Sequence, residues 1–229
     1  MNGIYNTKLV NIAGGGIAGL SSAQVLKLNG YNTVVYEKES NIGKSRHGDY
    51  EGFENWIFSS DINSFFQQIG FDFSKIRSFP INKFNVHTEF NKPILINQNK
   101  PFFYIIKRGC EQTDLDFQLY NQSKLAGVEF KFGHEAPKDC DVLATGTSKA
   151  AAYIRGINFK TDLNDQIHLL LGHKFAPKGY AYLIIINGEA TLATAYKKVK
   201  KQSDLISNCR DYFISVSYTH LTLPTNREV

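Results

Sequence analysis

The sequence of 229 residues contains only three cysteines, Cys110, Cys140 and Cys209, and they lie far apart in the chain. No C-x-x-C pair is present, so the sequence indicates neither a redox pair nor a metal site built on cysteines. A sparse and odd set of cysteines is typical of proteins kept in a reducing compartment. We therefore expect a cytoplasmic protein with reduced cysteines and no bound metal.

Long apolar runs are also missing. No stretch approaches the roughly 20 residues that a transmembrane helix needs, and the N-terminus leads almost at once into the first expected strand, without a signal peptide. The formal net charge is only +5, which fits an anionic cofactor or a weak attraction to anionic lipid. A peripheral contact with the membrane surface is compatible with this charge. No patch of basic and aromatic residues predicts nucleic-acid binding, and the oligomeric state is left open.

What the sequence does have is a glycine motif near its start. Residues 9–12 form a short apolar run, which predicts a strand buried on both faces. Gly14, Gly16 and Gly19 follow directly as G-x-G-x-x-G. In a dinucleotide site, Gly14 permits the tight turn, Gly16 lets the backbone approach a pyrophosphate, and Gly19 lets helix and strand pack closely.

A helix is predicted over residues 17–28, directly after the glycine turn. Leu20, Val25 and Leu28 are expected on its inner side, and Gly30 ends it. A helix N-terminus that faces the pyrophosphate favours negative charge, because its backbone N–H groups lack partners within the helix.

The next strand, residues 33–36, ends at an acidic residue. Glu37 stands at the distance from the glycines at which a carboxylate accepts hydrogen bonds from ribose hydroxyls, and Lys38 follows it. Ile17 and Ala18, in the first turn of the helix, complete the predicted contact set. The alternative is a glycine-rich loop without a ligand, but a strand before, a helix after and the acid beyond favour the nucleotide.

The remaining pattern predicts a dinucleotide-binding α/β unit in discontinuous pieces. Residues 40–56 are expected to form a long irregular loop, a kind of segment that is usually functional. Further elements are predicted as helices over residues 61–69 and 113–126 and as strands over residues 83–90, 92–98, 102–106, 128–132, 141–145, 157–159, 167–173, 180–186 and 190–195, with a hairpin turn at Asn187-Gly188.

Two domains follow from this order of elements. Residues 1–80 and 100–149 are predicted to form a Rossmann-like domain with a parallel sheet for FAD or NAD(P). Residues 81–99 and 150–214 are predicted to form a mostly antiparallel β domain for the substrate. The expected fold class is therefore α/β with an added antiparallel domain.

The last segment, residues 215–229, does not fit this scheme. Its sequence, SVSYTHLTLPTNREV, resembles a translated sequencing-library adapter, and we set it aside as a non-native tail. On this interpretation the chain is C-terminally truncated near Ile214 and represents the N-terminal part of a longer protein.

Several motifs jointly resemble FAD-dependent oxidoreductases of the geranylgeranyl reductase type, which have the p-hydroxybenzoate hydroxylase-like fold. The resemblance covers almost all of residues 8–207. It is carried by GGGIAGLSSAQVLKLNGYNTVVYEK, GKSRHGDYEGFENW, FFYIIKRG with LDFQL, DVLATG and APKGYAYLI. The second flavin motif of this family, a Gly-Asp pair, is expected beyond Ile214, so this part of the protein alone is expected to be inactive.

The resemblance implies roles for three further residues. Arg46 is similar to the loop arginine that lies along the cofactor, Arg108 to the arginine on the flavin side, and Gly146 to a glycine that passes close to FAD. A rigid guanidinium fork suits phosphate and ribose oxygens. For both arginines the alternative is a surface ion pair. Lys44 follows Gly43 where the family often has a second glycine, which leaves the backbone contacts there undecided.

By the same resemblance, the reaction is reduction of carbon–carbon double bonds in an isoprenoid or other apolar substrate, with NAD(P)H or another electron donor. The expected partner is an apolar small molecule or a prenyl lipid. No residue stands out as an obligatory general acid or base, so the catalytic residues stay unassigned. Two alternatives remain, namely an FAD-dependent monooxygenase of the aromatic hydroxylase type and a non-catalytic nucleotide-binding protein.

Overall fold

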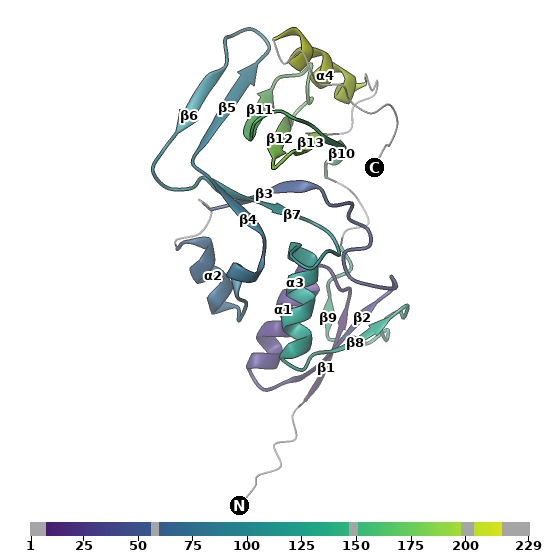
Figure 1. Ribbon diagram of the computed structural model, residues 1–229. Coiled ribbons are helices and arrows are strands. Elements are labelled where there is room, and N and C mark those ends of the chain that lie inside the picture. The colour runs from purple at the N-terminus through teal and green to yellow at the C-terminus, as the bar shows by residue number, and fades with distance from the viewer. Residues whose placement is uncertain (1–7, 56–59, 147–150, 198–203, 217–229) are drawn as a thin grey trace, which may run out of the picture. The chain divides into compact units, whose positions relative to one another are not determined.

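The computed structural model describes residues 8–55, 60–146, 151–197 and 204–216 (Figure 1). The chain divides into two compact units, one made of residues 1–80 and 103–148 and the other of residues 81–102 and 149–229. Each unit is therefore assembled from two separate pieces of the sequence. Among the described residues, no helix combines the length and the apolar character needed to cross a membrane.

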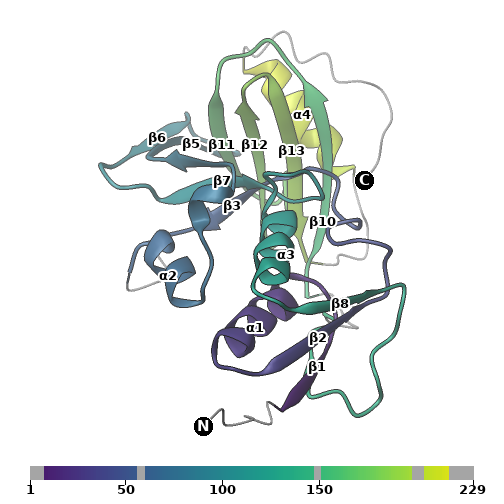
Figure 2. The same ribbon diagram turned by 60° about the horizontal axis from the view of Figure 1, so that its bottom comes forward.

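The first unit contains a four-stranded parallel sheet in the order β8-β2-β1-β9; Figure 1 labels all four strands, and Figure 2 labels β8, β2 and β1. Its strands are β1 (Leu9–Ala13), β2 (Asn32–Glu37), β8 (Glu129–Phe132) and β9 (Val142–Leu143). Helices α1 (Ile17–Leu28) and α3 (Leu115–Leu125) lie together on one face of this sheet in both views. The parallel sheet and its crossover helix confirm the predicted α/β class.

The inner face of α1 differs from the prediction. Leu20 is fully buried, but Val25 and Leu28 are 37% and 58% exposed, so placing these two on the inner side was wrong. Ala23 and Gln24 occupy the buried face instead, and the Gln24 side-chain amide donates to the Gly70 carbonyl at 2.6 Å. This hydrogen bond gives the amide N–H a partner, whereas Gln24 Oε1 has none among the described residues, so the bond offsets only part of the cost of burying a polar side chain there.

The expected irregular loop over residues 40–56 is shorter than predicted. Residues Tyr50–Glu54 form strand β3, which pairs antiparallel with β7 (Phe103–Lys107). Trp56 lies outside the described residues. The pairing was missed because β3 alternates weakly in hydrophobicity, and its partner is about 50 residues away. With β4 (Ser78–Ile81), these strands form a sheet in the order β3-β7-β4, flanked by α2 (Ile62–Gln68) and the short 3-10 helix Phe73–Lys75.

The second unit is a six-stranded sheet in the order β10-β13-β12-β11-β5-β6. Its strands are β5 (Lys83–Thr88), β6 (Ile94–Asn97), β10 (Tyr153–Lys160), β11 (Gln166–Leu171), β12 (Tyr180–Ile186) and β13 (Glu189–Tyr196). All pairs are antiparallel except β5 with β11. Asn187 and Gly188 both have positive φ, which confirms the predicted hairpin turn between β12 and β13.

Helix α4 (Leu205–Ser215), which the sequence pattern did not reveal, packs on this sheet. Its Cys209 and Phe213 join a core that includes Leu170 and Phe175. Ser215 ends this helix, so the first residue of the predicted non-native tail continues a regular element. Residues 217–229 lie outside the described residues, and the adapter interpretation of the tail stays a prediction.

A chain of polar side chains, with two buried histidines at its centre, links α4 to two strands of the second unit. The His87 Nε2 and His168 Nδ1 atoms lie 2.8 Å apart, and His87 Nδ1 lies 3.0 Å from the Tyr212 hydroxyl. His168 Nε2 contacts the Gln166 side chain at 2.8 Å. Burial lowers the pKa of His87, and burial together with the neighbouring His87 lowers the pKa of His168 to about 4.

The lowered pKa values of His87 and His168 predict that the folded protein loses stability in mild acid. A histidine with a depressed folded-state pKa contributes stability above its unfolded pKa of 6.5, and that contribution declines as the pH falls toward about 4. For His168 alone, we expect the free energy of unfolding to fall by about 2 kcal/mol between roughly pH 7.5 and pH 5. Urea unfolding followed by circular dichroism measures this change.

His168→Gln should flatten that pH dependence, whereas His173→Gln, which removes an exposed histidine of the same unit, should leave it intact. Equal pH slopes for wild type and His168→Gln would show that the buried pair does not carry the effect.

Candidate functional site

The glycine turn between β1 and α1 has the geometry that a close nucleotide approach requires. Gly14 adopts φ of +99°, and a Cβ there would lie 2.5 Å from the Ala144 carbonyl oxygen of the segment after β9. A Cβ on Gly19 would collide with the Gly14 carbonyl oxygen, so only glycine permits this approach of helix to turn. At Gly16 a Cβ would meet nothing within 4 Å among the described residues, which leaves its backbone open.

The N-terminus of α1 opens onto this turn without a side-chain cap. Gly16 is the N-cap residue, and the described residues supply no side-chain bond to the first turn, which also contains no acidic residue. The first N–H that bonds back within this turn is that of Leu20, to the Gly16 carbonyl at 2.9 Å. The N–H groups of Ile17 and Ala18 therefore present partial positive charge at the helix end.

Glu37, at the end of β2, faces the same turn. Its Oε2 accepts a hydrogen bond from the Gly15 N–H at 2.8 Å, and its Oε1 accepts one from the Glu39 N–H at 2.9 Å. Lys8, directly before the neighbouring strand, lies 3.8 Å from Asp141 instead. Each carboxylate oxygen has two lone pairs, so the two backbone bonds leave acceptor capacity for a ligand.

A cavity of about 920 Å³ lies between the glycine turn and the end of β2. Its walls combine the predicted turn and strand-end residues with a loop that follows β8. The lining residues are Ala13, Gly14, Gly16, Ile17, Ala18, Tyr36, Glu37, Lys38, Glu39, Ser45, His134, Glu135, Ala136, Pro137, Lys138, Cys140, Leu143, Ala144, Thr145 and Gly146. Seven of the ten predicted site residues therefore line one cavity.

The loop at residues 134–140 is the part of this wall that sequence reasoning missed. The His134 N–H donates to the Glu37 carbonyl oxygen at 3.3 Å, which ties the loop to the end of β2. The only signal in the sequence was its place between two parallel strands, because ligands gather at the carboxyl ends of such strands. Gly146, at the other rim, has φ of +80° and open space at its Cβ position among the described residues.

A second cavity, of about 230 Å³, adjoins the first and contains the two predicted arginines. It shares the α1 N-terminus and Glu37 with the larger cavity. The lining residues are Gly15, Gly16, Ile17, Glu37, Glu39, Asn41, Gly43, Lys44, Ser45, Arg46, Arg108 and Asp116. Gly43 has φ of +72° and passes so close to the Gly109 carbonyl that a Cβ there would collide with it.

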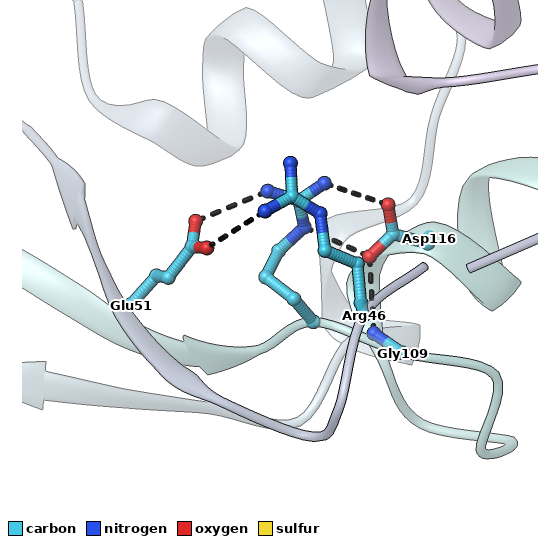
Figure 3. A network of polar contacts seen from close by, with 5 residues as sticks. Arg46, Glu51, Gly109 and Asp116 are labelled. Carbon is cyan, nitrogen blue, oxygen red and sulfur yellow. Dashed lines mark hydrogen bonds and ion pairs between the residues drawn. The ribbon is translucent and has the colours of Figure 1, made fainter. Parts of the chain in front are cut away.

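Arg108 is held by two protein carboxylates, Asp116 and Glu51, which are both labelled in Figure 3. Its Nε and Nη2 donate to the two oxygens of Asp116 at 2.8 Å and 2.7 Å, and its Nη1 donates to Glu51 Oε2 at 3.0 Å. Asp116 also accepts from the Gly109 N–H at 3.1 Å. The ion pair of Arg108 is buried, which differs from the surface ion pair given as the alternative, and the predicted contact of Arg108 with the cofactor stays a prediction.

The electrostatics of this cluster keep Arg108 charged. Burial acts to lower the pKa of Arg108, but the hydrogen bonds and charge of Asp116, followed by those of Glu51, outweigh it and raise the pKa above its ordinary value. Arg46, whose side chain is 44% exposed, contacts Glu51 Oε1 at 3.7 Å. Sequence reasoning missed Asp116 and Glu51, although the spacing of Arg108 from the start of the next helix was a usable signal.

The residues present fit a dinucleotide. An uncapped helix N-terminus, a carboxylate at the end of the second strand and a glycine turn that leaves its backbone open all border one cavity.

Cys140 also borders the larger cavity. The thiol of Cys209, in the other unit, is buried, and burial raises the pKa of Cys209 to about 12. In the described part of the chain, no group of three or more His, Cys, Asp and Glu side chains is arranged to hold a metal ion.

Comparisons with known proteins agree with this fold. A family model described as an NAD(P)-binding Rossmann-like domain matches residues 12–67. No curated protein sequence matches the chain. A solved structure of a geranylgeranyl bacteriochlorophyll reductase-like protein from Thermoplasma acidophilum is 18% identical, covers 97% of this chain and superposes with a TM-score of 0.64.

Two other solved structures have the same arrangement at lower identity. CtdE in complex with FAD is 14% identical over 92% of this chain, with a TM-score of 0.59. A variant of 2-methyl-3-hydroxypyridine-5-carboxylic acid oxygenase is also 14% identical, over 91% of this chain, with a TM-score of 0.62. This chain spans 65%, 68% and 64% of the lengths of these three proteins. At these identities, the likeness establishes the fold.

Proposed function

We propose that the first unit binds FAD and that the protein is an FAD-dependent oxidoreductase. The observation that carries this proposal is the cavity of about 920 Å³ between the uncapped N-terminus of α1 and the Glu37 carboxylate. The helix N-terminus favours the negative charge of a phosphate, and a carboxylate at the end of the second strand accepts hydrogen bonds from ribose hydroxyls. The FAD complex of CtdE, which has the same fold, supports FAD as the nucleotide.

Each group at the site has a distinct task in this proposal. When bound, FAD supplies hydride or electron transfer, and the protein supplies position and electrostatics. The open backbone at Gly16 and the N–H groups of Ile17 and Ala18 hold the pyrophosphate. Glu37 orients the ribose of the adenosine, and Arg46, which lines the smaller cavity, offers positive charge to the phosphates. Gly146 lets the larger cavity remain open at its rim.

The finer proposal is reduction of carbon–carbon double bonds in an isoprenoid or other apolar substrate, with the second unit as the substrate domain. It is supported by the sequence motifs and by the reductase-like neighbour. NAD(P)H or another donor would supply the electrons. In this proposal the protein is cytoplasmic, and a prenyl-lipid substrate would require a peripheral contact with the membrane surface.

An FAD-dependent monooxygenase is the second candidate. The specific observation in its favour is the oxygenase neighbour, whose TM-score of 0.62 is nearly equal to the 0.64 of the reductase-like protein. The fold therefore does not separate the two reactions. The predicted site residues are common to both candidates, because they concern the nucleotide and leave the reacting groups of the substrate unassigned.

Flavin titration tests the shared part of the proposal. The purified full-length protein, stripped of any flavin and titrated with FAD, should quench flavin fluorescence to saturation near one FAD per chain, and ADP should compete with it. NADH at the same concentrations should compete weakly, which separates an FAD site from an NAD(P) site. A full-length protein that stays unsaturated with FAD at millimolar concentration does not have the proposed site.

Turnover measurements separate the two reactions. With NAD(P)H and an aromatic acid, a monooxygenase should consume oxygen in proportion to product. A reductase should saturate a prenyl chain under anaerobic conditions with a reduced donor. Because this part of the protein alone is expected to be inactive, both reactions are measured with the full-length protein, and bound flavin without either reaction there supports the non-catalytic nucleotide-binding alternative.

A further inference from the structure

Glu51 contacts two arginines of very different burial, Arg46 and Arg108, and Figure 3 shows the Glu51 carboxylate facing both guanidinium groups. One carboxylate oxygen, Oε2, accepts from Arg108 Nη1 at 3.0 Å. The other, Oε1, lies 3.7 Å from Arg46 Nη1. A single side chain of β3 therefore holds the cluster together on the side that Asp116 does not reach.

The two arginines are bound with unequal strength. The Arg108 side chain is only 8% exposed and makes a two-pronged pair with Asp116 in addition to its bond with Glu51. The contact of Arg46 with Glu51 is longer than a charge-assisted hydrogen bond, which spans about 2.7–2.9 Å, and the Arg46 side chain is 44% exposed. An exposed pair contributes little to stability, so Arg46 can leave Glu51 while Arg108 remains in place.

The smaller cavity supplies the alternative partner for Arg46. Arg46 lines this cavity together with Lys44 and the backbone of Gly15 and Gly16. Glu51 is not among the described residues that line it. An anionic group in the cavity and the Glu51 carboxylate would therefore approach the Arg46 guanidinium from different sides and compete for its charge.

The other carboxylates around this cavity are already committed to partners. Both oxygens of Asp116 bind Arg108, and one of them also binds the Gly109 N–H. Both oxygens of Glu37 accept backbone N–H groups. Glu39 contacts Lys44 at 3.8 Å, which leaves Glu51 as the carboxylate joined to Arg46 in the described ion pairs.

We propose that Glu51 is an internal counter-ion that competes with the phosphates of the bound nucleotide for Arg46 and so sets the affinity of the site. This inference rests on the proposed FAD function. Arg108 stays on Asp116 throughout, as the fixed part of the cluster. Arg46 exchanges Glu51 for a phosphate oxygen when the nucleotide enters, and Glu51 is a positioning residue that draws Arg46 back when the nucleotide leaves.

Equilibrium titration of Glu51→Gln tests the competition. The variant removes the charge but keeps a carbonyl oxygen that can accept from Arg108. We expect it to bind FAD about 3- to 10-fold more tightly at low ionic strength, and the gain should shrink at about 0.5 M salt because exposed charges are screened. Riboflavin, which has no phosphate, should bind both proteins equally.

Two control variants make the test specific. Glu54→Gln removes an exposed carboxylate of the same strand, and it should bind FAD like wild type. In an Arg46→Gln background, Glu51→Gln should give no gain, because the contested guanidinium is absent. Thermal unfolding of each apoprotein checks that the fold is unchanged.

Three outcomes overturn the inference, and they differ from a failure of the proposed function. A Glu51→Gln variant that matches Glu54→Gln, a gain that persists without Arg46, or a weaker affinity would each exclude competition by Glu51 while leaving FAD binding intact. Wild type that binds neither FAD nor ADP would remove the proposed function and the inference together.

Discussion

Asp116→Ala is expected to lower the free energy of unfolding of the first unit by about 3–5 kcal/mol, because it leaves the buried Arg108 charge without its main partner. Two charge-assisted hydrogen bonds of 2.7 Å and 2.8 Å are lost. The Gly109 N–H also loses its acceptor. Glu51 remains, but it meets a single Nη1 donor and cannot replace the two-pronged contact.

Urea unfolding followed by circular dichroism measures this loss. Lys44→Ala is the matched control, because it removes an exposed pair of the same unit, with Glu39 at 3.8 Å, and should change stability by about 0–1 kcal/mol. If Asp116→Ala fails to fold, the double variant Arg108→Met with Asp116→Leu should recover most of the stability, since buried ion pairs can be replaced by apolar residues. An Asp116→Ala protein as stable as the control would show that the pair is not important for the fold.

The nucleotide-binding stretch was predictable because its constraints are local. Gly14 must adopt positive φ, and Gly19 must lack a Cβ, so these glycines indicate one turn geometry wherever they follow a buried strand. The helix over residues 17–28 was predicted with its observed bounds. Its buried face was not, because the burial of Gln24 depends on the Gly70 carbonyl, which the chain reaches more than 40 residues later.

The arginine cluster shows where sequence reasoning stops. A strand-end arginine can point into a cavity or toward a neighbouring helix, and the sequence of residues 107–116 permits both. The choice depends on how β7 and α3 meet, since that junction places Asp116 beside Arg108 at 2.7 Å. Glu51 joins the cluster through the pairing of β3 with β7, where it lies opposite Ile106. The sequence of one short strand such as β3 gives little indication of which distant strand it pairs with.

Removal of the Glu37 carboxylate is expected to have the largest effect on the nucleotide. In the proposed site, Glu37 accepts from the ribose of the adenosine, and hydrogen bonds to a charged group contribute about 1.5–3 kcal/mol. Glu37→Ala should therefore bind FAD roughly ten- to a hundredfold more weakly and purify largely free of flavin. The structure adds a second cause, because the same carboxylate accepts the Gly15 N–H and so supports the glycine turn.

Titrations with ligands that contain or lack the adenosine ribose separate these two causes. ADP contains the ribose that Glu37 is proposed to bind, whereas riboflavin contains neither this ribose nor a phosphate. Loss of ADP and FAD affinity with unchanged riboflavin affinity is the expected result for Glu37→Ala. Glu37→Gln, which keeps one acceptor for the Gly15 N–H at the 2.8 Å position, should recover part of the loss. If Glu37→Ala binds ADP as tightly as wild type does, the carboxylate serves only the turn, and the ribose must be held elsewhere in the cavity.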